Sequence, residues 1–509
     1  MLEQIVVSAE QMRQIEERVF AAGMPVPALM EKAAGLCANR IKTLYPLSKL
    51  LKVGILVGPG HNGGDALVVA RELKLAGYQV MVCRLIAKLK ELTANHAAYA
   101  KSLGIPFHEE IEPLQDCELI VDGLFGFGLT RSLSGKIAEA VNKLNSWWQP
   151  VVSIDIPSGI HTDTGEVLGT AVRATHTLCL GLWKRAFFQD QALAYIGKAE
   201  CLDWGIPSHA VRAIIPEPVP IRQMSEATAR QCLPLPRPVV THKYKQGHLL
   251  VIAGSNRYAG GVILTALGAR GSGVGMLSVA VPESLKPILV NHLPEALIIG
   301  CPETEEGAIA QLPPLAADFS NFDVIACGPG LTLEAKPVLE KVLTAECPLV
   351  LDADGLNILA RLDTIPTLSQ RSAPTVLTPH LGEFKRLFPE IENPNGDRIT
   401  AAQTAAQQSR AIILFKGSRT VIAHPDGSVW LIPASTPALA RGGTGDILTG
   451  LIGGLMGQKV GSQETLTETV ATAAWWHARA ALLAARERTE LGVDAFTLSQ
   501  YLVSSLDLI

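Results

Sequence analysis

Short apolar runs alternate with helix-like segments along almost the whole chain. In the first half the apolar runs cover residues 52–57, 79–83, 118–122 and 150–155, and each ends at a polar or glycine-rich turn. In the second half they cover residues 248–254, 276–282, 322–327, 348–354, 374–378 and 411–417. Apolar strands separated by helices are typical of parallel sheets covered by helices, so we expect an α/β fold in both halves.

Other segments carry local signals for single elements. Ser8 and Gln11 have the spacing of a capping box, which predicts an N-terminal helix. Residues 420–433 read as a hairpin with Pro-Asp-Gly at its turn, and the alanine-rich residues 468–486 predict a long helix.

The chain is long enough for two hydrophobic cores, because single cores stop growing at about 250–300 residues. The amino-acid composition changes between residues 214 and 240. This segment is rich in proline, which predicts an interdomain connection. Within this connection residues 225–233 could still form a short helix that opens the second domain. We therefore predict domains at 1–221 and 222–509.

Composition and charge exclude several classes of function. The formal charge is −4, and the lysines and arginines are scattered, so no face is expected to bind nucleic acid. No apolar run is long enough to span a bilayer, and the N-terminus lacks the pattern of a signal peptide. The nine cysteines occur singly, which fits a reducing compartment. We expect a cytoplasmic homo-oligomer that binds small molecules and neither nucleic acid nor membranes.

A glycine-rich turn, "GPGHNGGDA" at 58–66, follows the first apolar run and precedes a helix-like segment. Its glycines let the backbone approach a ligand closely, and the N-terminus of the following helix would face an anion such as a pyrophosphate. Two further strand ends carry Asp122 and, on the next strand, Asp155 with Ser158. Oxygen atoms of Asn62, Asp122 and Ser158 could together hold one cation, or each could cap a helix or turn.

Four segments resemble the epimerase domain of the NAD(P)H-hydrate repair proteins: "GPGHNGGDA", "VDGLFGFGLTRSLSG" (121–135), "DIPSG" (155–159) and "GLWKRAFF" (181–188). The resemblance implies a Rossmann-like three-layer domain that interconverts the R and S epimers of hydrated NADH or NADPH. It implies K⁺ held by Asn62, Asp122 and Ser158, and acid/base work by Asp155, with Lys184 as a second candidate. The implied substrate-binding positions are His61, Asn62, Gly63, Gly64, Asp65, Gly126, Phe127, Gly128, Leu129, Thr130, Arg131, Ser132 and Asp155. The family usually has glycine where this chain has Ala66, so the backbone there must suit a non-glycine residue.

In the second half, "LARGGTGDILTGLIGGLMG" (439–457) places three glycines before Asp446 and an apolar helix after it. The helix N-terminus would face a phosphate, and Asp446 could take a proton from a substrate hydroxyl, or could be an ordinary N-cap. Lys416 and Thr420 follow a strand, where they could contact nucleotide phosphates or ribose. His380 and Glu383 lie where another strand passes into a helix. A further strand end carries Asp352, Asp354 and Asn357, whose two aspartates could bind Mg²⁺ through water or cap the helix.

These segments resemble the NAD(P)H-hydrate dehydratase branch of the ribokinase-like superfamily. The resemblance is carried by "HKYKQGHLLVIAGS" (242–255), "GARGSGVGMLSVAVP" (268–282), "LPEAL" (293–297), "CGPGL" (327–331), "DADGLNIL" (352–359), "TPHLGEF" (378–384), "KGSRT" (416–420) and "GGTGD" (442–446). It implies that the hydrated nucleotide meets Gly261, Gly330, His380 and Asp446. It implies that the adenine nucleotide meets Lys416, Gly417, Ser418, Arg419, Thr420 and Gly445.

Both resemblances together imply a Rossmann-like epimerase domain followed by a ribokinase-like α/β dehydratase domain. The expected function is repair of hydrated NADH and NADPH: epimerisation at C6, then dehydration of the S epimer driven by phosphate transfer. The expected cofactors are K⁺ in the first domain and Mg²⁺ in the second, with ADP as co-substrate and ATP as the alternative. Two other hypotheses are a vitamin or sugar kinase with an accessory Rossmann-like domain, and a binding role for the first half like that of animal apolipoprotein-binding proteins.

Overall fold

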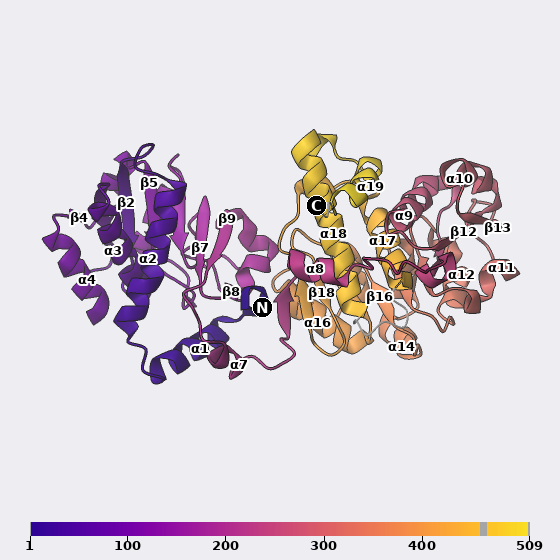
Figure 1. The fold of residues 1–509 in the computed structure, drawn as a ribbon, viewed down its shortest axis with the longest axis horizontal. Helices are drawn as coiled ribbons and strands as arrows, with labels where there is room; N and C mark the ends of the chain where they lie inside the picture. The colour runs from indigo at the N-terminus through magenta and orange to yellow at the C-terminus, as the bar shows by residue number, and fades with distance from the viewer. Residues whose placement is uncertain (1, 459–465, 507–509) are drawn as a thin grey trace. The chain divides into compact units, whose positions relative to one another are not determined.

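The computed structural model describes residues 2–458 and 466–506. Clustering of close residues divides the chain into two compact units, Met1–Ile221 and Arg222–Ile509. Each unit is built on its own large sheet, and the two are described separately (Figure 1).

Unit 1 contains a seven-stranded sheet of order β4-β3-β2-β5-β6-β7-β9, in which all neighbouring strands are parallel. Its strands are β2 (Lys52–Val57), β3 (Gln79–Cys83), β4 (Phe107–His108), β5 (Leu119–Gly123), β6 (Val151–Ile154), β7 (His176–Leu180) and β9 (Lys198–Leu202). A separate parallel pair joins β1 (Val6–Val7) to β8 (Trp183–Lys184).

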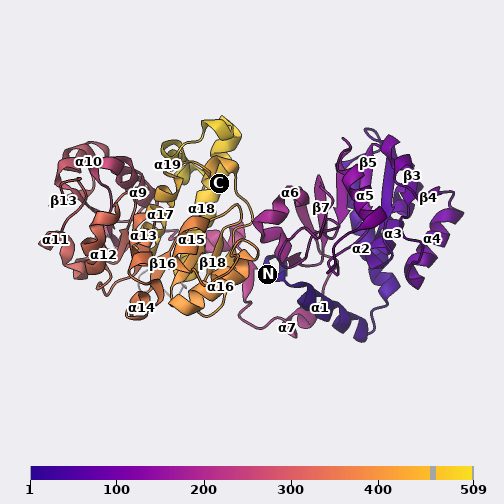
Figure 2. The same ribbon diagram turned by 180° about the vertical axis from the view of Figure 1, so that it is seen from behind.

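Helices cover both faces of this sheet. They are α1 (Ala9–Ala21), α2 (Val26–Leu44), α3 (His61–Leu75), α4 (Glu91–Ser102), α5 (Gly135–Leu144), α6 (Leu193–Ile196) and α7 (Ser208–Arg212). Side chains alternate across a strand, so Ile55 packs in one core with α2, α3 and α4, whereas its neighbour Leu56 packs in another core with α5. Unit 1 is therefore a three-layer α/β structure (Figures 1 and 2).

Unit 2 contains a ten-stranded sheet of order β10-β19-β18-β17-β16-β15-β14-β11-β12-β13. Its strands are β10 (Ile221–Gln223), β11 (His248–Ile252), β12 (Met276–Pro282), β13 (Leu297–Cys301), β14 (Val324–Cys327), β15 (Leu349–Leu351), β16 (Thr375–Leu377), β17 (Ile412–Phe415), β18 (Val421–Ala423) and β19 (Val429–Leu431). Neighbouring strands are parallel along the part of the sheet that runs β17-β16-β15-β14-β11-β12-β13. Strand β18 is antiparallel to both of its neighbours β17 and β19.

The helices of unit 2 are α8 (Glu226–Cys232), α9 (Ala259–Gly271), α10 (Lys286–His292), α11 (Pro314–Ala317), α12 (Lys336–Val342), α13 (Asp354–Arg361), α14 (Thr364–Ser369), α15 (Leu381–Leu387), α16 (Arg398–Ser409), α17 (Thr444–Gln458), α18 (Leu466–Arg488) and α19 (Ala495–Ser504). A single core joins one face of the sheet to α9, α17, α18 and α19. Within residues 2–458 and 466–506, no helix combines the length and apolar character that a membrane span requires.

The apolar runs correctly predicted most strands. Residues 52–57, 79–83 and 276–282 coincide with β2, β3 and β12, and the Ser8–Gln11 capping box opens α1. The hairpin, the short helix α8 and the long helix α18 are also confirmed. Strands β7, β9 and β13 carry no comparable signal, because they are short and contain polar or glycine residues. The strand predicted at 348–354 is longer than the observed β15, which ends at Leu351. The residues after Leu351 leave the sheet and contribute to the site described below.

Helices α9 and α17 lie unusually close because glycines face the partner backbone. A methyl group added at Gly450 would lie 1.8 Å from the carbonyl oxygen of Thr265, and one at Gly268 would lie 2.1 Å from that of Ile447. Contacts this short cannot be relieved by rotating a side chain, so the two helices would have to separate. The N-terminus of α17, which carries Asp446, depends on this packing.

Replacing Gly450 with alanine is therefore expected to destabilise unit 2 by about 3 kcal/mol or more, since overpacking of a dense core forces the backbone to move. Chemical denaturation monitored by circular dichroism measures the change. Gly260→Ala is the matched control, because Gly260 lies on α9 with no atom within 4 Å of the added methyl group. Equal stability of both variants would show that the close approach is unimportant.

Candidate active sites

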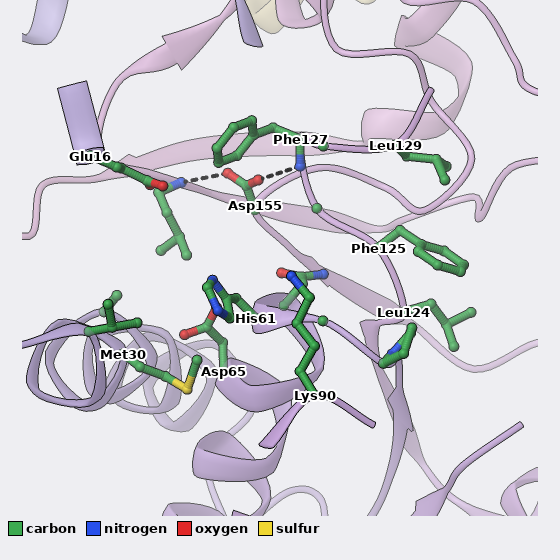
Figure 3. A pocket seen from close by; sticks show the side chains of 18 of the residues that line it. Glu16, Met30, His61, Asp65, Lys90, Leu124, Phe125, Phe127, Leu129 and Asp155 are labelled. Atoms are coloured by element: carbon green, nitrogen blue, oxygen red, sulfur yellow. Dashed lines mark hydrogen bonds between the residues drawn. The ribbon is translucent and has the colours of Figure 1, made fainter. Parts of the chain in front are cut away.

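A cavity of about 620 Å³ opens at the carboxyl ends of β2, β5 and β6 in unit 1 (Figure 3). This is the edge where the turns of a parallel sheet gather ligands. Ten of the residues predicted from the sequence line it: His61, Asn62, Asp65, Gly126, Phe127, Gly128, Leu129, Thr130, Arg131 and Asp155. The loop that follows β5 therefore forms one wall of the cavity, and the first turn of α3 forms another.

The Asp155 carboxylate is held by hydrogen bonds at the wall of this cavity. Its Oδ1 accepts a hydrogen bond of 2.6 Å from Lys184 Nζ, and its Oδ2 accepts one of 2.9 Å from the backbone N–H of Phe127. Its backbone has a φ of 68°, a left-handed conformation that costs free energy in a non-glycine residue and is often found at functional sites. Figure 3 shows its carboxylate between Phe127 and Glu16 at the cavity wall.

Lys184 lies behind Asp155 and does not line the cavity itself. Its side chain is fully buried and also donates a hydrogen bond to the carbonyl oxygen of Leu180. Burial disfavours the charged lysine, but the Asp155 carboxylate outweighs this effect and keeps the pKa of Lys184 above its usual value. Lys184 is thus a permanent cation that holds Asp155 in place.

Asp122 and Ser158 contact each other directly, and Asn62 lines the cavity. Asp122 accepts hydrogen bonds from the hydroxyl and N–H of Ser158, at 2.6 and 2.9 Å, and from the hydroxyl of Ser153. The side-chain nitrogen of Asn62 is buried with no hydrogen-bond partner. A methyl group added at Gly126 would lie 3.4 Å from the amide carbon of Asn62, so this loop passes directly over the amide.

The glycine turn at 58–66 is shorter than the sequence suggested, because α3 already begins at His61, with Gly60 as its N-cap. Gly63 and Gly64 do not line the cavity: added methyl groups would lie 1.9 Å from the Gly58 carbonyl oxygen and 2.6 Å from Met30 Sδ. They allow close packing rather than contact with a ligand. Ser132 also lies outside the cavity lining. Ala66 is helical, so its replacement of glycine causes no backbone strain.

The sequence reasoning missed part of the cavity wall. Glu16 of α1, Trp204, and the cationic Lys88 and Lys90 all line the cavity. Glu16 lies within a helix, and Trp204 follows β9, a strand that the sequence did not predict, so no local pattern singled them out. Only packing of α1 and of the segment after β9 against the sheet brings them to the site.

In unit 2 Asp446 lies in the first turn of α17 and is half-buried. A methyl group added at Gly261 would lie 3.4 Å from Asp446 Oδ2. The same methyl group would lie 3.8 Å from the backbone nitrogen of Gly330. The structure therefore brings Asp446, Gly261 and Gly330 together, as predicted. Burial and the Asp352 carboxylate together raise the pKa of Asp446 to about 7, against the opposing effect of Lys416.

Lys416 forms the centre of a buried charge network beside Asp446. Its Nζ lies 2.8 Å from Asp352 Oδ1 and 3.9 Å from Glu383 Oε2. Burial raises the pKa of Asp352, but the Lys416 ammonium group outweighs this and holds it below its usual value. A methyl group added at Gly445 would lie 3.5 Å from Lys416 Nζ, so Lys416 and Gly445 face the same space.

Two further groups set the geometry of this region. The ring nitrogen Nδ1 of His380 accepts a hydrogen bond from the Gly382 N–H, and the backbone N–H of His380 donates one to the Glu383 carboxylate. The predicted strand-to-helix junction is therefore a capping box at the start of α15. His477 of α18, absent from the sequence predictions, has its Nε2 2.9 Å from the carbonyl oxygen of Thr444. Burial lowers the pKa of His477 to about 4, so its ring is neutral near pH 7 and holds the start of α17.

The side chains of Asp352 and Asp354 make hydrogen bonds within the protein. Asp352 accepts hydrogen bonds from Lys416, the Ala353 N–H and the Thr449 hydroxyl. Asp354 accepts bonds from the Thr332 N–H and from Asn357. Within residues 2–458 and 466–506 no group of three or more His, Cys, Asp or Glu side chains could hold a metal ion.

Comparison with known proteins finds a match for each unit. Residues 249–504 match the family described as NAD(P)H-hydrate dehydratase, and residues 26–186 match the family described as YjeF-related protein N-terminus. A solved structure, the ADP/ATP-dependent NAD(P)H-hydrate dehydratase of Bacillus subtilis co-crystallised with ATP/Mg²⁺, is 35% identical and covers 56% of this chain and 96% of its own, with a TM-score of 0.48.

Relatives that span both units are also found. The bifunctional NAD(P)H-hydrate repair enzyme Nnr of Synechocystis sp. is 57% identical over 98% of this chain and 94% of that protein. The corresponding enzyme of Thermosynechococcus vestitus is 50% identical over 98% of this chain and 97% of that protein. The chain therefore belongs to the bifunctional NAD(P)H-hydrate repair enzymes, which combine an epimerase domain with a dehydratase domain.

Proposed function

We propose that residues 1–221 form the epimerase domain, with its site at the Asp155 cavity, and that residues 222–509 form the dehydratase domain, with its site at Asp446. The observation that carries this assignment is the position of Asp446. It lies in the first turn of α17, beside the partly buried Lys416 and next to Gly261 of α9, which faces the Gly330 turn. A helix N-terminus of this kind attracts phosphate groups, and the carboxylate is placed to receive a hydroxyl proton.

In the epimerase site we propose that Asp155 exchanges a proton with the C6 hydroxyl of the hydrated nicotinamide. The hydrogen bonds from Lys184 and from the Phe127 N–H fix the direction of the Asp155 carboxylate, as a base requires. The walls formed by His61, Asn62, Asp65 and the 126–131 loop would hold the nucleotide. Positive charges from Lys88, Lys90 and Arg131 on the same cavity suit its phosphates.

Three of the predicted residues fit a potassium ion. Asn62, Asp122 and Ser158 supply amide, carboxylate and hydroxyl oxygens, which are the ligands that hard cations prefer. The buried Asn62 amide has no hydrogen-bond partner for its nitrogen, and nitrogen and oxygen are assigned to an amide by the contacts around them. Bound K⁺ would stabilise the loop that crosses Asn62 at Gly126, and so the wall of the cavity.

In the dehydratase site we propose that Asp446 takes the C6 hydroxyl proton while the oxygen attacks the terminal phosphate of ADP, which leaves AMP. The phosphate then departs with the C6–O bonding electrons, a proton is lost from C5, and the nicotinamide ring is restored. Phosphate is a much better leaving group than hydroxide, which explains the use of a nucleotide. Gly261, Gly330 and His380 would contact the hydrate, and Lys416, Gly417, Ser418, Arg419, Thr420 and Gly445 would contact ADP.

We further propose that Mg²⁺ reaches this site with the nucleotide. Because Asp352 is already paired with the Lys416 ammonium group at 2.8 Å, its negative charge is matched and it does not fit as a metal ligand. Mg²⁺ commonly keeps several waters and binds substrate phosphates with few protein contacts.

All nine cysteines are free thiols, which supports a reducing, cytoplasmic location.

Asp446→Asn is expected to lower recovery of NADH from its S hydrate by at least about 100-fold, because the hydroxyl loses its base. Ultraviolet absorbance of reduced cofactor measures recovery with ADP present, and release of AMP and inorganic phosphate is measured in parallel. Wild-type enzyme should yield intact NADH, whereas a kinase would accumulate a stable phosphorylated product. Epimerisation by the variant should remain; loss of both activities would contradict separate sites.

The dehydratase rate is expected to depend on pH through Asp446. Because the pKa of Asp446 is raised to about 7, the base form is lost below that value, and kcat/KM should fall about tenfold for each unit of pH below 7. Above pH 7 the rate should level off. Initial rates on the S hydrate between pH 5 and 9 test this, and a flat profile down to pH 5 would exclude Asp446 as the base.

Asp155→Asn is expected to limit repair of a mixed R and S hydrate to the S fraction, because epimerisation falls about 100-fold or more. Chromatographic separation of the two epimers measures the remaining R hydrate against a blank for spontaneous conversion. Dehydration of pure S hydrate by the same variant is the control for the dehydratase site, and an unchanged circular dichroism spectrum shows that unit 1 is folded. Full recovery of both epimers at the wild-type rate would rule out Asp155 as the epimerase base.

A further inference from the structure

A second carboxyl group, Glu16, enters the epimerase cavity from helix α1. It is half-buried and lines the cavity together with Asp155, and Figure 3 shows both groups labelled at the same wall. Helix α1 lies before residue 26, where the match to the YjeF-related family begins, so Glu16 is outside the matched segment. None of the sequence motifs includes it.

The surroundings of Glu16 are mostly apolar. The neighbouring lining residues of α1, α2 and the adjacent segments are Phe20, Val26, Leu29, Met30, Ala33, Leu180 and Trp204. Among the residues that the structure describes, the Glu16 carboxyl group makes no hydrogen bond and no ion pair, which leaves it free to contact a ligand. A carboxylate in such a setting is poorly solvated, so its protonated form is favoured.

Burial raises the pKa of Glu16 to about 7, although the Lys184 ammonium group opposes this rise; Asp155 adds a smaller upward effect. The other titratable groups lining the cavity are His61, Asp65, Lys88, Lys90 and Arg131. Burial also raises the pKa of Asp65 well above its usual value, so Asp65 adds little negative charge. Near pH 7 a substantial fraction of Glu16 is therefore protonated.

Glu16 and Asp155 thus have opposite environments within one cavity. Asp155 accepts hydrogen bonds from the Lys184 ammonium group at 2.6 Å and from the Phe127 N–H at 2.9 Å, whereas Glu16 has neither kind of donor. Two carboxyl groups whose surroundings favour different protonation states are the usual arrangement of an acid and a base. One cavity wall thus offers both a proton acceptor and a proton donor.

We propose that Glu16 is the proton donor of the epimerase reaction and works as a pair with Asp155. This inference rests on the proposed function of the cavity as the epimerase site. In the hydrate, C6 carries a hydroxyl group and is bonded to the ring nitrogen N1. An epimerase must make C6 planar for a moment, which requires a bond at C6 to break and re-form.

The two groups achieve this by opening the ring. Asp155 takes the hydroxyl proton, the O–H electrons form a C6=O double bond, and the C6–N1 electrons move to N1, which receives the proton of Glu16. Rotation about the C5–C6 bond then presents the other face of the aldehyde. N1 attacks that face as it returns its proton to Glu16, and the oxygen takes back the proton from Asp155. Both carboxyl groups end in their starting states, and no other reactant is needed.

The test compares Glu16→Gln with the full-length wild type. Glutamine keeps the shape of the side chain but cannot give up a proton, so epimerisation should fall about 100-fold or more. Glu17→Gln is the matched control, since Glu17 is the next residue of α1 but is exposed and paired with Arg13. Glu16→Asp, which keeps the acid at a shorter reach, should retain more activity than the glutamine variant. Conversion of pure R hydrate is followed by chromatographic separation of the epimers between pH 5.5 and 9.

The pH profile separates a proton donor from a residue that only shapes the cavity. Wild-type kcat/KM should fall about tenfold per pH unit above 7, as Glu16 loses its proton, and the residual activity of Glu16→Gln should lack this fall. A glutamine variant with unchanged kcat and a raised KM, or with the wild-type profile, would overturn the inference. Absence of epimerase activity in the wild type would instead refute the proposed function. Unchanged dehydration of S hydrate and unchanged circular dichroism show that the variants are folded.

Discussion

A buried lysine–aspartate pair at the carboxyl end of a parallel sheet is the interaction on which both units depend. In unit 1 Lys184 pairs with Asp155 at 2.6 Å, and in unit 2 Lys416 pairs with Asp352 at 2.8 Å. A charge removed from water is costly unless an opposite charge and further hydrogen bonds accompany it. Each pair meets this condition, since backbone or hydroxyl donors complete the hydrogen bonds of the aspartate. The site geometry is therefore set by a requirement of stability.

In both units a second carboxyl group lies beside the pair without a cation of its own. Glu16 takes this place in unit 1 and Asp446 in unit 2, and burial raises the pKa of each to about 7. The same physical arrangement serves two different chemical tasks. In the proposed roles Glu16 must be protonated to act, whereas Asp446 must be ionised. Both reactions therefore work together best near neutral pH, where each group occurs in both forms.

Glycine has a different purpose at different points of the two sites. Gly126 leaves room next to Asn62 and Asp155, and Gly261 leaves room next to Asp446. A side chain at either position would enter the space available to a ligand. Gly63, Gly268 and Gly450 instead let backbone segments touch, and their lack of a side chain fixes the position of α3 and α17. A glycine-rich motif is thus partly a binding feature and partly a packing feature, and only the contacts distinguish the two.

The sequence by itself determined the features that depend on neighbouring residues: the strands β2, β3 and β12, the capping box of α1, and carboxylates such as Asp155 and Asp446 next to strand ends or helix starts. Apolar runs and helix caps are local, so their pattern is legible in one stretch of chain. Only the tertiary structure decided which charges pair, since Lys184 lies 29 residues from Asp155 and Lys416 lies 64 from Asp352. It also brought Glu16 to the cavity from a helix that carries no motif. The reason is that solvation and protonation depend on every segment packed around a group, and most of those segments are remote in the sequence.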